Sequence, residues 1–322
     1  MARIPLSLAI GGYDHVRDLL DGRITPNGID LLPLELPIEE ITFRFTRHGE
    51  WDASELSFGK TVGLLTQDKP AIVPIPVFPS RVFRHSAIYV REGAGIAAPK
   101  DLEGRRVGVP EWAQTAGIYV RGLLQHDYGV DLRAIDWVQA GVNAPGRREK
   151  IALSLPPGLK LTPAPDKSLS GMLASGEIDA AVSAREPGNA KRLFEDYQGL
   201  ELAYWKKTRI FPIMHVVVLR RETYERHRWL AMNLMQAFEA AKRRSLARAI
   251  ELSVSHMPLP WIADSAKRWR DLAGEDFWPY GVEPNRATLE AYLQYAFEQG
   301  VCRRRLAVEE VFAPETLSSF KI

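Results

Sequence analysis

The sequence predicts an α/β fold of two lobes, with one lobe inserted into the other. Short apolar runs alternate with helical patterns, and this alternation starts afresh near Pro99. Repeated strand–helix units imply a largely parallel sheet with helices on both faces. After a last strand pattern at 214–219 the chain becomes almost entirely helical. We therefore expect a discontinuous first lobe of residues 1–90 and 211–322, and a second lobe of residues 91–210.

The elements of the first lobe follow from local patterns. The apolar run 4–10 predicts a strand, and a helix follows it at 15–20. The turn Thr25-Pro26-Asn27-Gly28 precedes the next strand pattern. The remaining patterns in this half are strands at 29–36 and 51–56, helices at 39–47 and 59–67, and extended segments at 72–78 and 87–90.

The second lobe repeats the alternation, and the chain then returns to the first. We expect strands at 106–109, 135–139 and 178–182, helices at 115–126 and 168–175, and a Pro-rich surface loop at 155–165. The C-terminal helices are predicted at 224–252, 261–273 and 286–300. In the first of them Leu230, Leu234 and Phe238 recur every four residues and should face a core. Crossings near 84–92 and 205–216 would form a hinge, and the cleft between such lobes is a natural ligand site.

Composition excludes several classes of protein. Lys plus Arg number 42 and Asp plus Glu 40, so the net charge of +2 provides no general field for nucleic acid. The single cysteine, Cys302, excludes an intrachain disulfide framework and a cysteine-based metal site. No H-E-x-x-H or other compact metal motif is present, although a metal held by scattered side chains stays open. We expect a small-molecule ligand and no nucleic-acid partner, and a homo-oligomer is left open.

The N-terminal apolar run is read as a strand rather than a secretion signal. It ends at Gly11-Gly12 with no small-residue cleavage pattern after it. No apolar run approaches the length of a membrane span. We therefore expect a cytoplasmic protein with no membrane partner.

The most informative stretch is residues 76–90, where Arg81, Arg84 and His85 lie between a Pro-rich apolar run and a strand-like run. Arginine grips a carboxylate with two hydrogen bonds, and histidine moves a proton near neutral pH. An extended segment puts Arg81 and His85 on one face and Arg84 on the other, whereas a helical turn clusters all three. In both cases we expect Arg81 and His85 at the cleft with an acidic ligand. The alternative is a set of surface ion pairs at the hinge.

Turns that follow strands of the first lobe supply further candidates. Tyr13 and His15 follow Gly11-Gly12, where glycines let a ligand approach the backbone, and one of them should lie at the mouth of the cleft. The alternative is a plain strand–helix turn. Glu55 and Ser57 lie at a strand end before a helix, where open α/β sheets bind ligands. For Ser57 the alternative is a helix cap.

Four more candidates lie beyond residue 110. Thr115 opens a helix and is read as part of an anion site or as a plain cap. Arg147, at the start of an expected helical pattern, and Arg185, after a buried strand, should reach into the cleft. His215 lies in an apolar strand at the hinge and is either a core residue or a cleft residue.

Six segments together resemble one known family over nearly the whole chain. They are FPSRVFRHSAIYV at 78–90, DLEGRRVGVPEWAQTAGIYVRG at 101–122, PGRREK at 145–150, SGEIDAAVSAREP at 175–187, FPIMHVVVLRRETY at 211–224 and GEDFWPYGVEPNRATLEAYLQYAFEQG at 274–300. The family is that of the 4,5-dihydroxyphthalate decarboxylases. The resemblance implies the two-lobed type 2 periplasmic binding protein-like fold. We expect Trp278 and Tyr280, in the last segment, to pack against the first lobe.

The resemblance also implies a non-oxidative carboxy-lyase that converts 4,5-dihydroxyphthalate to protocatechuate and CO2. A general acid must then reach the ring carbon: His85 is the first choice, His215 the second, and Glu55 a third if burial raises its pKa. Cations should hold the carboxylate that stays. Tyr13 or a histidine would stabilise the developing oxygen charge. The cations expected in this role are Arg81, Arg185 and Arg147.

No organic cofactor is expected, because the phenol itself serves as the electron sink; a divalent metal is left open. One alternative is a non-catalytic cytoplasmic solute-binding protein for a small aromatic or organic acid. Another is a different enzyme of the same family. The first would bind the ring compound without turnover, and the second would leave it unbound.

Overall fold

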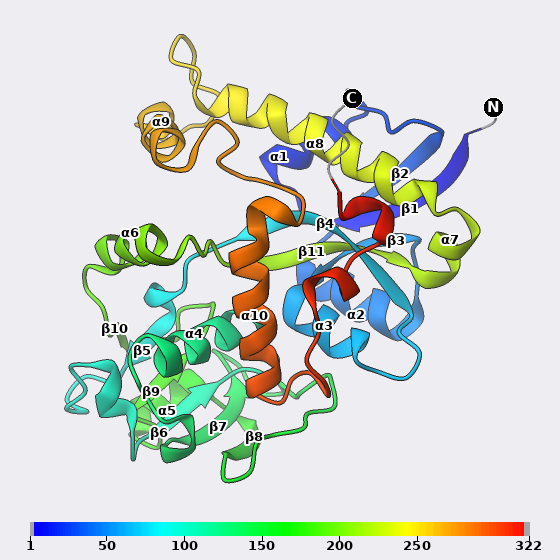
Figure 1. The fold of residues 1–322 in the computed structure, drawn as a ribbon. Coiled ribbons are helices and arrows are strands. Elements are labelled where there is room, and N and C mark those ends of the chain that lie inside the picture. Colours follow the sequence, from blue (N-terminus) through cyan, green and yellow to red (C-terminus); the bar gives the residue numbers. More distant parts are fainter. Residues whose placement is uncertain (1–2, 319–322) are drawn as a thin grey trace.

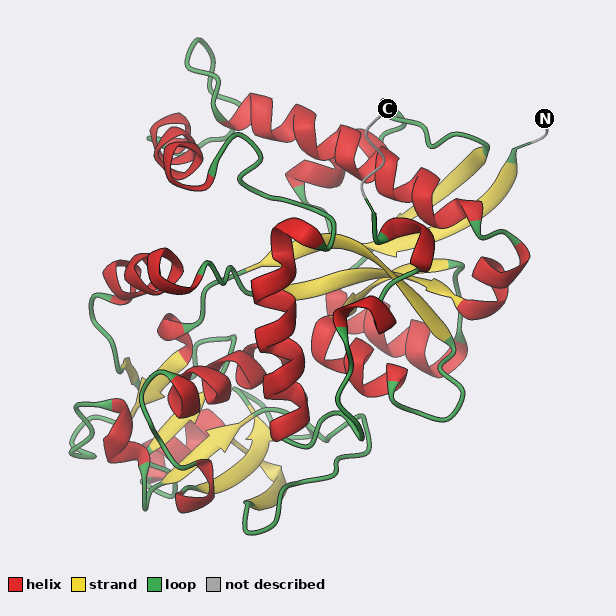
Figure 2. Ribbon diagram, in the orientation of Figure 1, coloured by secondary structure: helices red, strands yellow, loops and turns green. Residues whose placement is uncertain are grey.

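The computed structural model describes residues 3–318, which form two lobes, each around a β-sheet (Figure 1, Figure 2). In the first sheet the order is β2-β1-β3-β11-β4. β1 pairs in parallel with β2 and β3, and β11 runs antiparallel between β3 and β4. The strands are β1 Ile4–Ile10, β2 Ile29–Glu35, β3 Ala53–Ser57, β4 Ile72–Arg81 and β11 Ile213–Arg220.

The second sheet has the order β10-β5-β9-β6-β7-β8. Its strands β9, β6, β7 and β8 are parallel, and β5 runs antiparallel to β9 and β10. The strands are β5 Ile88–Val90, β6 Arg106–Val109, β7 Asp136–Gly141, β8 Lys160–Ser168, β9 Ala180–Val182 and β10 Lys191–Arg192.

Helices cover both sheets, as the predicted α/β class requires (Figure 2). Up to residue 175 they are α1 Asp14–Leu20, α2 Ile38–His48, α3 Phe58–Leu65, α4 Thr115–His126 and α5 Leu169–Ser175. Beyond it they are α6 Tyr197–Thr208, α7 Arg221–Arg226, α8 Trp229–Ala249, α9 Ile262–Ala273 and α10 Arg286–Glu298.

The chain passes from the first sheet to the second between β4 and β5, and returns between α6 and β11. The strand pattern at 87–90, which the sequence analysis assigns to the first lobe, therefore lies in the second sheet. It is there because β5 forms antiparallel pairs with β9, including Ile88 opposite Val182. The crossing segments are residues 82–87 and 209–212.

The prolines of β4 are compatible with a strand because β4 lies at the edge of its sheet. The C-terminal part of the chain covers that edge. The backbone N–H of Ala313 donates to the Pro74 carbonyl at 2.9 Å, and that of Gly281 to the Pro76 carbonyl at 2.8 Å. The indole N–H of Trp278 donates to the Phe78 carbonyl at 3.1 Å. The expected packing of the Trp278 segment on the first lobe is confirmed.

The C-terminal helices differ from the prediction in two ways. The single helix expected at 224–252 is divided, because His227 leaves the helical region with φ −146° between α7 and α8. Leu230, Leu234 and Phe238 on α8 are fully buried, as predicted. Residues just after α10 also bind the second lobe: Gln299 accepts from the Arg121 guanidinium at 2.8 Å, on α4. The helical tail thus contacts both lobes.

Two local predictions in the second lobe are wrong. The loop expected at 155–165 contains the start of β8, which pairs in parallel with β7. Its Pro163 is tolerated because β8 is an edge strand. No helix forms at 146–149, where Gly146 has φ +100° and its N–H donates to the Pro165 carbonyl at 2.7 Å.

Candidate active site

A cleft of about 220 Å³ lies between the two lobes. One wall comes from α2, α3 and the adjoining ends of β3, β4 and β11, and the other from the start of α4 and loops of the second lobe. The predicted site residues that line it are Ser57, Arg84, Thr115, Arg147, Arg185 and His215. The predicted site residues that do not line it are Tyr13, His15, Glu55, Arg81 and His85.

His215 lies at the centre of the first-lobe wall. It is on β11, and its register partners are Ser57 on β3 and Ser80 on β4. Side chains in register share one face of a sheet, so these three polar groups stand together. All three line the cleft.

The Glu55 carboxylate contacts the His215 ring on the side away from the cleft. Its Oε1 lies 2.6 Å from Nδ1 of His215, and the Tyr13 hydroxyl donates to the same oxygen at 2.6 Å. Its Oε2 accepts the backbone N–H of Gly11 at 2.8 Å. Because Nδ1 is engaged by this fully buried carboxylate, the Nε2 edge of the ring is the one presented to the cleft.

The protonation state of Glu55 corrects one expectation. Burial raises the pKa of this carboxyl, but hydrogen bonds from His215, Tyr13 and the Gly11 backbone oppose burial, and the pKa is lowered overall. Glu55 is therefore an ionised partner for His215. The expectation that burial would make it an acid is wrong.

Tyr13 and His15 lie behind His215, away from the cleft. The Tyr13 hydroxyl is committed to Glu55, and burial together with that carboxylate raises its pKa. The His15 ring packs between Tyr13 and Trp278, with ring centroids 5.3 and 5.2 Å away. Burial lowers the pKa of His15 to about 4. Neither residue lies at the mouth of the cleft, contrary to the prediction.

Arg81 points to the opposite face of β4 from the cleft. Because Ser80 faces the cleft, alternation along the strand directs the next side chain the other way. The Arg81 guanidinium donates to the Phe211 carbonyl at 3.2 Å, to the Pro279 carbonyl at 2.7 Å and to the Asn285 side chain. It ties the strand to the C-terminal segment, so the predicted role in ligand binding is wrong.

His85 is also turned away from the cleft. It is 3% exposed and packs against the rings of Tyr128, Phe194 and Tyr204, at centroid distances of 5.3 to 6.3 Å. Burial lowers its pKa to about 4, which keeps it neutral near pH 7. The expectation that His85 faces the cleft is wrong, because the chain turns into the 3-10 helix His85–Ala87 after the strand has ended.

Arg84 is the member of this segment that reaches the cleft. Its Nε and one terminal nitrogen lie 3.1 and 2.9 Å from the sulfur of Met214. No carboxylate within residues 3–318 forms an ion pair with it. Burial lowers its pKa to about 10, so it remains a cation at neutral pH. Arg84 is thus a charged group with its ion-pairing capacity unused.

The arginines of the second lobe reach the cleft as predicted, but they are already paired. Arg185 lies 2.9 Å from Oε1 of Glu39, on α2 of the first lobe. Arg147 lies 3.5 Å from the same oxygen and 2.5 Å from Glu111. Glu39 therefore links the two lobes across the cleft.

Thr115 joins the lobes at the floor of the cleft. Its hydroxyl oxygen accepts the backbone N–H of Gly59 at 3.0 Å and lies 3.3 Å from the Ser57 hydroxyl. A Cβ at Gly59 would come within 2.3 Å of the Ala113 carbonyl oxygen, so the close approach requires glycine. Ser57 also accepts the Lys60 N–H at 3.4 Å, which makes it a helix cap as well as a cleft residue.

Lys60 is a cleft residue that the sequence analysis missed. It is 6% exposed on α3, and burial followed by the charge of Lys150 lowers its pKa to about 8. The clue in the sequence is the position of Lys60, three residues after Ser57, in the strand–helix turn that is expected to bind a ligand. At neutral pH it is a cation that exchanges its proton readily.

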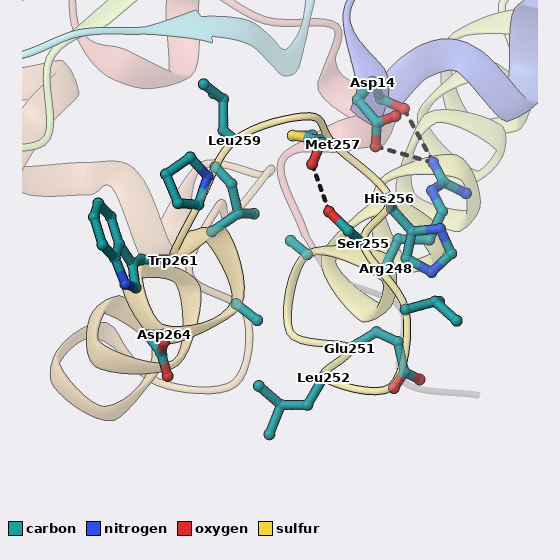
Figure 3. Close-up of a pocket in the computed structure, with 15 residues that line it drawn as sticks. Asp14, Arg248, Glu251, Leu252, Ser255, His256, Met257, Leu259, Trp261 and Asp264 are labelled. Carbon is teal, nitrogen blue, oxygen red and sulfur yellow. Dashed lines mark hydrogen bonds and ion pairs between the residues drawn. The ribbon is translucent and has the colours of Figure 1, made fainter.

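A second hollow of about 230 Å³ lies beside the end of α8 (Figure 3). Its ionised Arg248 is held by Asp14 at 3.1 Å and by Asp18 at 2.5 Å. Its other wall is the 250–261 loop, where Trp261 is 75% exposed. None of the predicted site residues lines it, and its partly buried Arg248 is already paired with two carboxylates.

Two kinds of feature are absent from residues 3–318. No group of three or more His, Cys, Asp or Glu side chains is placed to hold a metal ion. No helix in the same range is long and apolar enough to span a bilayer.

Comparison with solved structures defines the class. The aliphatic sulfonate-binding protein SsuA of Escherichia coli aligns with a TM-score of 0.52 at 14% identity, over 98% of this chain and 99% of that one. The alkanesulfonate-binding protein SsuA of Xanthomonas axonopodis pv. citri, bound to MOPS, aligns with 0.51, over 98% of each chain. The chain therefore has the predicted periplasmic binding protein-like fold.

Relatives in sequence define the family. A 4,5-dihydroxyphthalate decarboxylase of Comamonas testosteroni is 39% identical over 330 residues, covering all of both chains. One of Pseudomonas putida is 41% identical over 207 residues, covering 62% of this chain and 80% of that one. No family model matches. The chain belongs to the 4,5-dihydroxyphthalate decarboxylase family, which confirms the predicted resemblance and the carboxy-lyase class, and does not favour the binding-protein alternative.

Proposed function

We propose that this protein is a non-oxidative decarboxylase that converts 4,5-dihydroxyphthalate to protocatechuate and CO2. The observation that carries the proposal is the Glu55–His215 pair, which presents one edge of an imidazole to a cleft that also contains the cation Arg84. A cleft of about 220 Å³ suits a one-ring compound. Family membership supplies the reaction class.

The chemistry follows from the instability of an aryl carbanion. Loss of a proton from the hydroxyl para to the leaving carboxylate pushes electrons into the ring. A general acid then adds a proton to the carbon that bears this carboxylate, which gives a dienone. The C–C bond breaks, its electron pair restores the aromatic ring, and CO2 leaves. One proton is consumed at carbon, and no oxidant or reductant is needed.

His215 is assigned as the general acid. Its Nδ1 is held by ionised Glu55, which stabilises the protonated ring and fixes the orientation of Nε2. Glu55 acts through His215 and is a positioning residue. The Tyr13 hydroxyl donates a hydrogen bond to Glu55 and so holds that carboxylate in place. We assign this positioning role to Tyr13.

Cations of the cleft supply binding and charge stabilisation. Arg84 is assigned to the carboxylate that stays on the ring, because it is the cleft arginine without an ion pair among the described residues. Lys60, with its pKa lowered to about 8 by burial, is assigned to the phenolic oxygen that becomes negative. Arg147 and Arg185 would join them when the ligand's charge competes with Glu39.

The proposal extends to cofactor, location and partners. The phenol serves as electron sink, so no organic cofactor is required, and a divalent metal is left open. Dialysis against a chelator decides the metal question: an unchanged rate shows that no metal is needed, and a lost rate that a divalent metal restores shows that one is. The protein is proposed to work in the cytoplasm on a small aromatic carboxylate, without nucleic-acid or membrane partners. Cell fractionation tests the location, and light scattering the oligomeric state left open.

The direct test is turnover. Purified protein is incubated with 4,5-dihydroxyphthalate, and CO2 and protocatechuate are measured together. The proposal predicts equal amounts of both products. Saturable binding without turnover would instead support a solute-binding protein. Neither binding nor turnover would support a family member with a different substrate.

A further inference from the structure

A further cavity, the hinge cavity of about 270 Å³, lies on the opposite face of β4 from the cleft. Figure 1 shows α6 and α9 on the left of the molecule. The end of α6, the end of α9, the segment that follows α9 and the start of α10 supply its walls. None of the residues that line the cleft lines this cavity.

Aromatic rings form much of its lining. Trp205 from α6 and Trp269 from α9 meet at a centroid distance of 4.8 Å, and Phe211 lies 5.6 Å from Trp269. Phe277 completes the set. Faces and edges of aromatic rings favour a flat aromatic occupant, because offset and edge-to-face stacking add to the area buried.

Two arginines give this aromatic cavity a positive character. Arg209 caps α6 in the left-handed region with φ +59°, and its guanidinium lies 4.5 Å from the Trp205 ring centroid. It is exposed, and no carboxylate among the described residues pairs with it. Arg81 is buried, and its Nε has no hydrogen-bond partner within residues 3–318. Asp276, which also lines the cavity, pairs with Lys242 at 2.7 and 2.8 Å, and Glu239 shares this lysine at 2.8 Å.

We propose that this hinge cavity is a second binding site, for a small aromatic carboxylate, with Arg209 holding the carboxylate and Trp205 and Trp269 holding the ring. Because the cavity lies at the hinge, a ligand bound there affects the movement of the lobes. Arg209 and Phe211 belong to the crossing from α6 to β11, and Arg81 ends the strand that leads into the other crossing. A ligand in this cavity touches residues at both crossings between the lobes. It therefore shifts the balance between open and closed forms of the distant cleft.

The inference does not depend on the proposed function, because its test measures binding with the cleft disabled. The probe is radiolabelled benzoate, and the method is equilibrium dialysis against the Arg84→Ala variant. We expect saturable binding of one benzoate per chain. Cyclohexanecarboxylate, which has the charge but no aromatic ring, should compete at least tenfold less well.

Two further changes, made in the Arg84→Ala background, locate the bound probe. Arg209→Ala removes the guanidinium, and Ala273→Trp fills the cavity without changing charge. Each should weaken benzoate binding at least tenfold. Lys206→Ala, which removes an exposed charge beside the same helix end but outside the cavity lining, should leave binding unchanged. No saturable binding in Arg84→Ala, or binding that survives both Arg209→Ala and Ala273→Trp, would overturn the proposal.

Discussion

Two arginine–histidine sets, both close to β4 and β11, differ in what surrounds them. In the cleft, Arg84 has no ion-pair partner among the described residues, and His215 has one nitrogen engaged and one presented to the ligand space. Away from it, Arg81 is held by three oxygens and His85 is enclosed by aromatic rings. Both sets are largely removed from solvent. Access to the cleft, rather than burial or residue type, separates the reactive set from the structural one.

Substitution of His215 and of His85 should give the largest difference in kcat between the two sets. His215→Asn removes the proposed acid, and we expect kcat to fall about 10²–10⁴-fold with substrate binding retained. His85→Phe keeps the aromatic packing and should keep kcat close to that of the unchanged protein. Steady-state kinetics and equilibrium binding measure both. A His85 variant that loses turnover while His215→Asn keeps it would reverse the assignment.

Exchange of the arginines should separate binding from stability. Arg84→Met removes a charged hydrogen-bonding group worth about 1.5–3 kcal/mol to the ligand, so KM should rise about 10–100-fold with little change in Tm. Arg81→Met removes the donor to the Phe211 carbonyl and one of the two donors to the Pro279 carbonyl, and should cost about 1–3 kcal/mol of unfolding free energy with KM unchanged. Denaturant unfolding and kinetics are the measurements. The same effect in both variants would break the comparison.

The buried histidine should also appear in the pH dependence of stability. The pKa of His85 is lowered from 6.5 to about 4 by burial, so the unfolded chain binds the extra proton first as pH falls. The free energy of unfolding should therefore fall between pH 6.5 and 4, by about 2 kcal/mol at pH 5 from this residue. His85→Phe should flatten the slope in this window. An unchanged slope would contradict the neutral, buried state of His85.

The smallest effect concerns the ion pairs that join the lobes. Glu39→Gln releases Arg185 for the ligand, while Arg147 keeps its pair with Glu111, and KM should fall by up to about fivefold, since exposed pairs are worth about 0.2–1 kcal/mol. Glu40→Gln is the matched control, because Glu40 is equally exposed but pairs with Arg44 within α2. Kinetics at low and high salt would measure the difference. A rise in KM for Glu39→Gln would show that Glu39 assists binding.

The sequence predicted the fold better than it predicted the site. Alternating strand and helix patterns, and the apolar period of Leu230, Leu234 and Phe238, depend on local chemistry that the chain carries with it. The resemblance to one family was equally accessible, because it rests on contiguous segments. The strand at 87–90 was assigned to the wrong sheet because partner choice depends on residues nearly a hundred positions away.

The site required geometry that local patterns do not contain. In the segment with Arg81, Arg84 and His85, residue types indicated an anion site, but the end of β4 decides which side chain reaches the cleft. Glu55 was recognised at a strand end, yet its role follows from its contact with His215, 160 positions away. Lys60 was missed because a lysine is unremarkable until burial lowers its pKa.

The central claim is that the substrate ring lies against His215 and Arg84. The most direct measurement is a crystal structure of the His215→Asn variant with 4,5-dihydroxyphthalate bound. The account predicts one carboxylate on the Arg84 guanidinium and the carbon bearing the other carboxylate next to residue 215. A ring bound beside His85 and Tyr204, or held in the cleft with both carboxylates turned away from Arg84, would contradict it.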